Sequence, residues 1–339
     1  VEPQRNKIQL FQKQVFVTDS VEGIVPDFLT LLHGVIDSPD IPLNVSRSYL
    51  QADGNVKKIA SHITKKVADK LDEMFRKDRA DFESKWNDMK IIIEYGMLTE
   101  DKFFDKAKKF AMYADTDGGL HTFEAYLESI KEQQTDKDKK TVVLYASNKD
   151  AQHSYIQNAK SKGYSVLLLD SPLTSHLLQK LEQEHENTTF ARVDSDLIDN
   201  LIKKDETRVA KLSDKQKEEL KTRLETIVPK EKFTLKLEDM DSTEAPLVIT
   251  VPEFMRRMKE MQMTGGGGMM GMGDFPDMYD LIVNANHPLA SKILDTEDAE
   301  ARSSAVNQAL DLAKLQQNLL HGEELTAFIA RSYEMLGNE

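Results

Sequence analysis

The chain has 339 residues, enough for two or three domains that each bury a core of their own. It carries 58 acidic and 45 basic side chains, a formal net charge of -13, which disfavours a non-specific nucleic-acid binder and favours protein or small-molecule partners. It has no cysteine, which excludes disulfides and thiolate chemistry, and neither an apolar run of membrane-spanning length nor a signal peptide, so we expect a cytoplasmic protein.

The first segments of the chain combine strand and helix signals. From Ile8 to Val17, apolar residues recur with strand-like spacing and β-branched content, which predicts a strand or a bent hairpin. Pro26 then precedes an apolar stretch that reaches Gly34, and this pattern predicts an amphipathic helix. Because the chain begins at Val1 without an initiator methionine, and its first apolar pattern is a strand, we expect a fragment of a longer protein.

The segment Pro42 to Gln51 carries side chains suited to a phosphate group. Its proline and its turn-forming residues predict a helix start, which puts Arg47 and Gln51 one turn apart. A guanidinium binds phosphate in a fork, and an amide can orient an oxygen. The chain has no glycine-rich phosphate loop, so a nucleotide that this pair contacts must be held by another segment, as with an arginine finger. The alternative is an ordinary solvated helix start.

Four helices are predicted over the next part of the chain. Apolar residues fall on one face at spacings of three and four between Val56 and Phe75, which is typical of a long amphipathic helix. Trp86, the single tryptophan, is expected in the core rather than on a binding surface. The expected helices cover residues 56–75, 86–95, 102–113 and 122–131, and the polar run 133–140 predicts a connecting loop.

From Thr141 the pattern changes to short strands that alternate with helices. Strands are predicted at residues 142–145, 166–169 and 190–193, and helices at 150–160 and 172–184. This alternation predicts a small parallel sheet with helices packed on it. The turn Tyr145-Ala146-Ser147-Asn148 has no glycine to admit a phosphate, so we do not expect a nucleotide there.

A methionine-lined helix is the most unusual feature of the last third of the chain. It is predicted at residues 254–261, and four glycines follow it. Before it, a capping box at Ser213 to Gln216 predicts a helix start, and residues 233 to 251 have strand character. Phe254, Met258 and Met261 form one stripe, with cationic residues on the other side. Such a stripe is ordinarily buried in a core, but methionine also suits surfaces that bind many different sequences.

The chain ends in a strand, a turn and two amphipathic helices. The strand is predicted at residues 281–284, and His287 before Pro288 favours a structural role in the turn. Two terminal amphipathic helices with no later element to cover them need a partner for their apolar faces. The residues expected to meet that partner are Val306, Leu310, Leu319, Leu325, Phe328, Ile329 and Leu336.

Several of these segments resemble one family. The order Ile41-Pro42-Leu43-Asn44-Val45-Ser46-Arg47, followed by Leu50-Gln51, is similar to the middle-domain catalytic loop of the ninety-kilodalton heat-shock chaperones, bacterial members included. The segments at residues 15–38 and 284–288 are similar to the middle and C-terminal domains of that family. One position differs, because Ser48 stands where the family usually has glutamate, and this puts any role of that acid in doubt.

The resemblance implies specific roles for the residues singled out above. It implies that Arg47 and Gln51 are catalytic and reach the γ-phosphate of ATP held by a separate N-terminal domain. ATP and magnesium are then expected only in the full-length protein, with no cofactor and no metal site in this fragment. It implies that unfolded client proteins bind an amphipathic helix at Phe254, Met255, Met258 and Met261. It also implies a homodimer through the C-terminal helices.

The expected fold is a multidomain α/β and α+β chain. Residues 1–55 are predicted to end a large α/β layer domain that carries the catalytic loop, and residues 56–138 to form a helical segment. A small α/β sheet domain at 139–204 and an α+β dimerisation domain at 205–339 complete the prediction.

The predicted function is the middle and C-terminal part of an ATP-dependent chaperone. Such a fragment should not hydrolyse ATP by itself, because the nucleotide domain is missing. The alternative from another class is a non-enzymatic dimeric scaffold or adaptor that binds an acidic partner through Arg47 and Gln51. An independent enzyme ranks third, since no nucleophile and base stand at a recognisable spacing.

Overall fold

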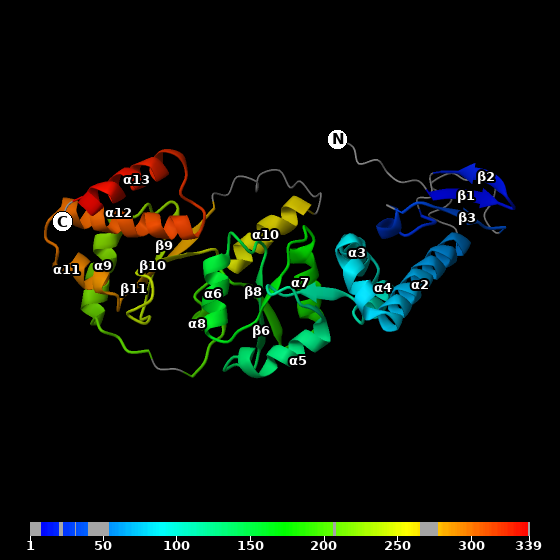
Figure 1. Cartoon of the computed structure of the whole chain (residues 1–339), viewed down its shortest axis with the longest axis horizontal. Coiled ribbons are helices and arrows are strands. Elements are labelled where there is room, and N and C mark those ends of the chain that lie inside the picture. The colour runs from blue at the N-terminus through cyan, green and yellow to red at the C-terminus, as the bar shows by residue number, and fades with distance from the viewer. Residues whose placement is uncertain are drawn as a thin grey trace. The chain divides into compact units, whose positions relative to one another are not determined.

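The computed structural model describes residues 8–19, 23–30, 32–39, 54–205, 208–264 and 277–337. The chain forms two compact units, the first from residues 1–129 with 171–185 and the second from residues 130–170 with 186–339 (Figure 1). Helices and small sheets are mixed in both, which agrees with the predicted α/β and α+β character. The finer domain bounds given above stay predictions.

The first unit begins with a three-stranded sheet in the order β2-β1-β3. The hairpin of β1 (Ile8–Gln12) and β2 (Val15–Thr18) is antiparallel, as predicted, and β3 (Gly34–Asp37) runs parallel to β1. The prediction of an amphipathic helix after Pro26 was wrong. The structure has only the 3-10 helix η1 (Asp27–Leu29), and Gly34 starts a strand, because this apolar stretch supplies buried residues and then a third strand.

Helices dominate the rest of the first unit. They are α2 (Gly54–Lys77), α3 (Arg79–Thr99), α4 (Asp101–Ala107), α5 (Phe123–Gln134), which continues into the second unit, and α7 (Thr174–Glu184). Trp86 is buried, as predicted. A Cβ on Gly96 would lie 2.8 Å from the Phe28 ring and 2.9 Å from the Phe103 ring, so only glycine lets α3 approach both rings this closely.

The helix expected at 102–113 was too long. It ends at Ala107, and the chain then forms the hairpin of β4 (Met112–Ala114) and β5 (Leu120–Thr122). The Asp115 Oδ1 atom closes the turn, because it accepts hydrogen bonds from the backbone N–H of Asp117 at 2.8 Å and of Gly119 at 2.9 Å. Gly118 has a φ of 93° in this turn, a conformation that glycine adopts without strain.

The second unit contains the predicted parallel sheet, in the order β7-β6-β8. Its elements are β6 (Thr141–Ala146), α6 (His153–Ser161), β7 (Val166–Leu168), β8 (Thr188–Arg192) and α8 (Ile198–Leu201). Leu144 of β6, Ile156 of α6 and Val166 of β7 share one buried cluster. Gly163, with a φ of 79°, follows the C-cap of α6, which confirms the helix end expected there.

A second sheet, in the order β10-β11-β9, anchors the last part of the chain. Its strands are β9 (Phe233–Glu238), β10 (Leu247–Thr250) and β11 (Tyr279–Asn284), and the helices beside them are α9 (Asp214–Glu225), α11 (Pro288–Asp295), α12 (Ala299–Gln316) and α13 (Gly322–Gly337). Ser213 and Gln216 form the predicted capping box of α9. Leu220, Leu281 and Val306 belong to one buried cluster that joins this sheet to its helices.

Candidate functional site

The methionine-lined segment forms helix α10 (Glu253–Thr264), directly after β10 and Pro252. None of its residues is buried, although it is an amphipathic helix in the middle of a folded unit. Three of its charged side chains are well covered. The Arg256 side chain is 9% exposed, that of Arg257 14% and that of Glu253 22%.

The charged face of α10 docks on the parallel sheet through Glu253. Its carboxylate accepts hydrogen bonds from the Tyr145 hydroxyl at 2.8 Å and from the backbone N–H of Arg192 at 3.0 Å. The Arg256 and Arg257 guanidinium groups also contact it, at 2.8 and 2.7 Å. Burial alone would raise the pKa of Glu253, but these two arginines outweigh it and the pKa is lowered. The carboxylate is therefore ionised and shared by four donors.

The two arginines extend the contact across the sheet. Arg256 donates to the Tyr145 hydroxyl at 2.5 Å and to Glu260 at 2.7 Å, and Arg257 donates to the carbonyl of Phe190 at 2.8 Å. Burial, and then the nearby Glu253 carboxylate, raise the pKa of Tyr145, so its hydroxyl keeps its proton and can donate. Tyr145 lies near the carboxyl end of β6, and Phe190 lies in β8. The charged face of α10 thus occupies the sheet edge where α/β proteins commonly bind ligands.

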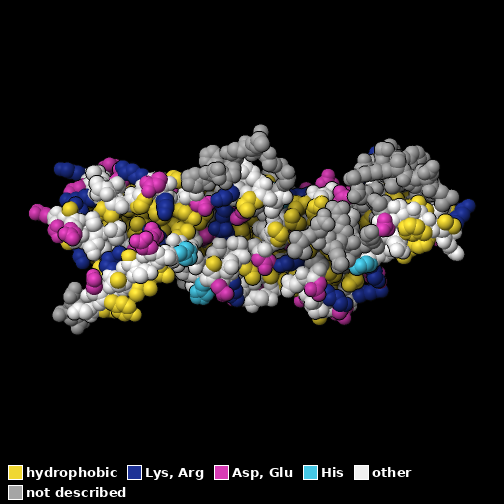
Figure 2. Space-filling model, turned by 90° about the horizontal axis from the view of Figure 1, so that it is seen from above, with side chains coloured by type: hydrophobic (Ala, Val, Ile, Leu, Met, Phe, Trp, Pro, Cys, Tyr) yellow, Lys and Arg dark blue, Asp and Glu magenta, His cyan; other side chains and the backbone are white. Residues whose placement is uncertain are grey.

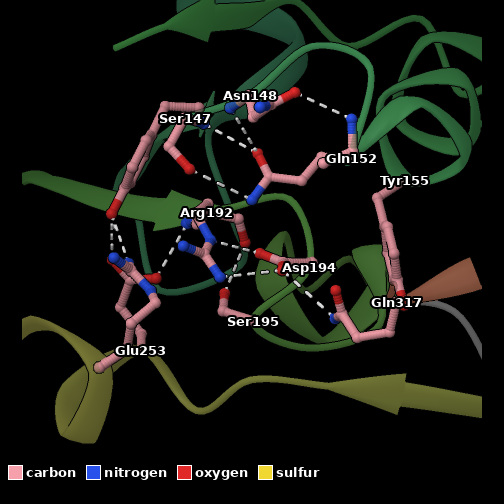
Figure 3. A network of polar contacts seen from close by, with 12 residues as sticks. Ser147, Asn148, Gln152, Tyr155, Arg192, Asp194, Ser195, Glu253 and Gln317 are labelled. Atoms are coloured by element: carbon pink, nitrogen blue, oxygen red, sulfur yellow. Dashed lines mark hydrogen bonds and ion pairs between the residues drawn. The ribbon is translucent and has the colours of Figure 1, made fainter. Parts of the chain in front are cut away.

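The carboxyl end of β8 carries a second polar cluster beside the first (Figure 3). Arg192 binds Asp194 in a fork, with Nε to Oδ1 at 2.6 Å and Nη2 to Oδ2 at 3.0 Å. Gln317, at the end of α12, donates to Asp194 and to the carbonyl of Ile249, both at 3.3 Å. The Tyr155 hydroxyl donates to the same carbonyl at 2.6 Å. The Asp194 side chain is 1% exposed, so these partners replace the hydrogen bonds that water would otherwise supply.

The apolar side chains of α10 point the other way. Phe254 is 71% exposed, Met255 57%, Met258 38% and Met263 79%, and Met261 is partly buried. Figure 2 shows hydrophobic side chains lying among charged ones on one face of the protein. An amphipathic helix normally buries its apolar face. Here the charged face is covered and the apolar face is open.

The other predicted site residues lie in different places. Arg47, Ser48 and Gln51 fall outside the described residues, so their geometry is not part of the structure. His287 has the structural role expected, because its ring accepts a hydrogen bond from the backbone N–H of Leu289 at the start of α11. Among the described residues, no three His, Asp or Glu side chains are placed to hold a metal ion. None of the described helices is long and apolar enough to span a membrane.

The residues expected at a dimer interface differ in how far they are buried. Val306 and Leu310 are buried in the core of their own chain, where they pack with the second sheet. Leu319, Leu325 and Phe328 are partly buried, and two residues of α13 are open, Ile329 at 44% and Leu336 at 78%.

Sequence reasoning missed the polar residues that dock α10. Tyr145 and Arg192 come from the parallel sheet, Asp194 follows β8, and Glu253 comes from a helix more than fifty positions later in the chain. One signal was available, because Glu253, Arg256 and Arg257 stand three and four positions apart, which places their charges on one face of the helix. No periodicity shows that such a face is the buried one.

Comparison with known proteins assigns the chain to a family. The model of the family described as Hsp90 protein matches residues 1–337. The chain is 44% identical to the chaperone protein htpG of Bacteroides fragilis, over 98% of this chain and 58% of that protein. It is 50% identical to the chaperone protein HtpG of Porphyromonas gingivalis, over 92% of this chain and 46% of that protein.

A more distant relative, the chaperone protein HtpG of Myxococcus xanthus, is 25% identical over 95% of this chain and 49% of that protein. The chain thus spans about half the length of the curated relatives it matches. Since the family model covers nearly every residue and two of these relatives share more than two fifths of the aligned residues, the chain belongs to the Hsp90 protein family.

Proposed function

We propose that this chain is part of a cytoplasmic molecular chaperone and holds unfolded client proteins on the open apolar face of α10. The observation that supports this most is that the charged face of the helix packs on the protein, while Phe254, Met255, Met258 and Met263 are exposed. The related proteins named above, which are called chaperone proteins, support the same class of function.

The chemistry of the face suits clients of many sequences. Exposed apolar side chains gain free energy when a partner removes them from water, at about 25 cal/mol per Å². Methionine is flexible and polarizable, so it adapts to differently shaped side chains. The cations of α10 are already engaged, since Arg256 and Arg257 contact Glu253 and Lys259 pairs with Asp277 at 2.6 Å. The expected ligand is therefore an apolar segment of an unfolded chain.

The test combines Phe254→Ser with Met258→Ser and measures how tightly the protein holds a chemically unfolded test protein. Losing about 1.5 kcal/mol of apolar contact weakens binding about tenfold, so the double variant should bind at least tenfold more weakly. Val209→Ser is the matched control, because Val209 is 76% exposed elsewhere in the second unit. Undiminished holding by the α10 double variant would refute the proposal.

We further propose that Arg47 and Gln51 act on ATP bound by a separate domain of a longer protein, which would also hold magnesium. The support is the resemblance of the surrounding loop and the family to which the chain belongs. Removing an arginine finger costs on the order of a thousandfold in rate, so Arg47→Ala in the longer protein should nearly abolish turnover while ATP still binds. Gln51→Ala should act more weakly, because it removes a neutral hydrogen bond. Turnover that survives Arg47→Ala would exclude this role.

We also propose that the chain forms a homodimer through α13. The support is the open apolar surface of this helix, where Ile329, Tyr333 and Leu336 are exposed. Removing residues 325–339 should leave a folded monomer, because Val306 and Leu310 of α12 keep their own core. Sedimentation analysis measures the result, and a dimer that persists after the deletion would place the interface elsewhere.

A further inference from the structure

We propose that Arg192 and Asp194 are positioning residues that tie α10 to the end of α12, so that the end of one helix fixes the angle of the other. This inference rests on the proposed function only in giving α10 the role of a client-binding helix. The contacts that carry it meet at the carboxyl end of β8, in the cluster drawn in Figure 3.

The end of α12 reaches this cluster through Gln317. Gln317 is the C-cap residue of α12 and is 9% exposed. Its amide donates to Asp194 and to the carbonyl of Ile249 in β10. The next residue, Asn318, has a φ of 58° and donates to the carbonyl of Ala151 at 2.9 Å. Consecutive residues therefore fix the end of α12 against the parallel sheet.

The start of α10 reaches the same cluster from the other side. The backbone N–H of Val251, two residues before the helix, donates to the carbonyl of Asp194 at 2.8 Å. The backbone N–H of Arg192 donates to Glu253, the first residue of the helix. The Arg192 guanidinium also lies 3.8 Å from Glu260, about two turns further along the same face of α10. Residues 192–194 thus make two contacts with α10 and one with the segment that leads into it.

The side chains of Arg192 and Asp194 connect the two sides. Their fork of two hydrogen bonds fixes the plane of the guanidinium, which a single ammonium group cannot do. Asp194 has the two oxygens needed to bind Arg192 and Gln317 at once. If an amide replaces that carboxylate, one of the two oxygens is lost, and the contacts with Arg192 and with Gln317 are weakened together. The pair is therefore placed to pass a displacement of α12 to α10.

The inference is tested by changing a residue that does not contact α10. Within the described part of the chain, the side-chain hydrogen bonds of Gln317 go to Asp194 and Ile249 and none goes to α10. The chain has no native cysteine, so spin labels can be attached at Met263→Cys on α10 and Gln157→Cys on α6. Met263 is 79% exposed and Gln157 is also exposed. The distance distribution between the two labels reports the angle of α10.

We expect a narrow distribution of label-to-label distances in the otherwise unchanged protein. The distribution should become broad in Asp194→Asn and in Gln317→Ala. Gln317→Ala should add nothing in the Asp194→Asn background, because both changes break the same connection. Arg192→Lys, which keeps the charge but not the fork, should broaden the distribution less than Arg192→Ala. The control is Glu225→Gln, which removes a solvent-facing ion pair to Lys230 and should leave the distance unchanged.

Two outcomes separate this inference from the proposed function. If Gln317→Ala and Asp194→Asn lower the melting temperature but leave the distance narrow, the cluster only stabilises the fold and the positioning role is wrong. If the distance broadens while the holding of unfolded protein by the same variants and by the α10 variants stays unchanged, positioning stands and client binding by α10 is wrong.

Discussion

Helices α9 and α10 have the same length, twelve residues, and lie in the same unit, yet they present opposite faces to it. In α9, Leu220 and Leu224 are fully buried, while four of its eight charged residues are exposed and none is buried. In α10 no residue is buried, and the least exposed of its charged side chains are those of Arg256 and Arg257. Helix α9 has eight charged and two apolar residues, whereas α10 has five of each. The helix with more apolar residues is thus the one whose apolar face is open, so apolar content alone does not decide which face packs.

The surface beneath each helix explains the difference. Helix α9 packs on the apolar cluster that contains Phe233 and Ile293, where leucine is the suitable neighbour. Helix α10 meets a tyrosine hydroxyl, a strand carbonyl and the end of β8, which offer hydrogen-bond partners instead. Covering a charge is costly unless it is paired. Glu253 meets that condition, because it is shared by two arginines.

The largest expected effect contrasts a leucine of α9 with an apolar residue of α10. Leu220→Ala should lower the free energy of unfolding by about 3 kcal/mol, because a fully buried leucine leaves a cavity when it is shortened. Phe254→Ala should change it by less than about 0.5 kcal/mol, because the side chain is 71% exposed. Urea unfolding of both variants gives the comparison. A large loss for Phe254→Ala would show that the apolar face of α10 belongs to the core.

A smaller loss is expected from Glu253→Gln. The change keeps the shape of the side chain but leaves Arg256 and Arg257 without their shared carboxylate, which should cost about 2 kcal/mol of unfolding free energy. Glu225→Gln, whose ion pair with Lys230 faces solvent, should cost less than about 0.5 kcal/mol. Equal losses in the two variants would mean that the docked face of α10 contributes no more than a surface ion pair.

The contribution of Glu253 should also depend on pH. Its pKa is lowered in the folded chain, so its stabilising effect is complete above the unfolded value of about 4.3 and is lost as pH falls through the folded value. The difference in unfolding free energy between the unchanged protein and Glu253→Gln should therefore shrink below about pH 4.3. Other acids with lowered pKa values, such as Asp69 and Asp115, titrate in both proteins and cancel. A difference that stays constant down to pH 3 would contradict this account.

Local signals in the sequence predicted many elements correctly. The capping box at Ser213 and the long apolar stripe of α2 depend on neighbours within a few residues, and both are found. The helix expected after Pro26 and the extension of α4 to Tyr113 failed for a common reason. In both stretches apolar residues are spaced densely enough to fit a long helix, but the helix ends early and the apolar residues further on belong to a strand.

The candidate site was predicted only in part, because its polar residues are distant in the sequence and meet only in the folded chain. The stripe that contains Phe254 and Met258 is readable at helical spacing, and the structure exposes both side chains. The cluster of Arg192, Asp194 and Gln317 joins residues up to 125 positions apart, and nothing near each of them in the sequence indicates the others. Arg47 and Gln51 were singled out by resemblance, and their role stays a prediction.

The smallest expected effect comes from Lys259, the cation of α10 that does not contact the sheet. Lys259 pairs with Asp277 at 2.6 Å, and both side chains are about half exposed, so Lys259→Gln should cost less than about 0.5 kcal/mol of unfolding free energy. The same variant separates two kinds of partner. If α10 binds apolar segments, holding of unfolded protein should be unchanged at low and at high salt. If α10 instead binds an acidic partner, as an adaptor would, removing this charge should weaken binding most at low salt, where electrostatic attraction is least screened. If Lys259→Gln binds its partner more weakly than the unchanged protein at low salt but not at high salt, α10 binds through charge. That result would count against the binding of apolar client segments.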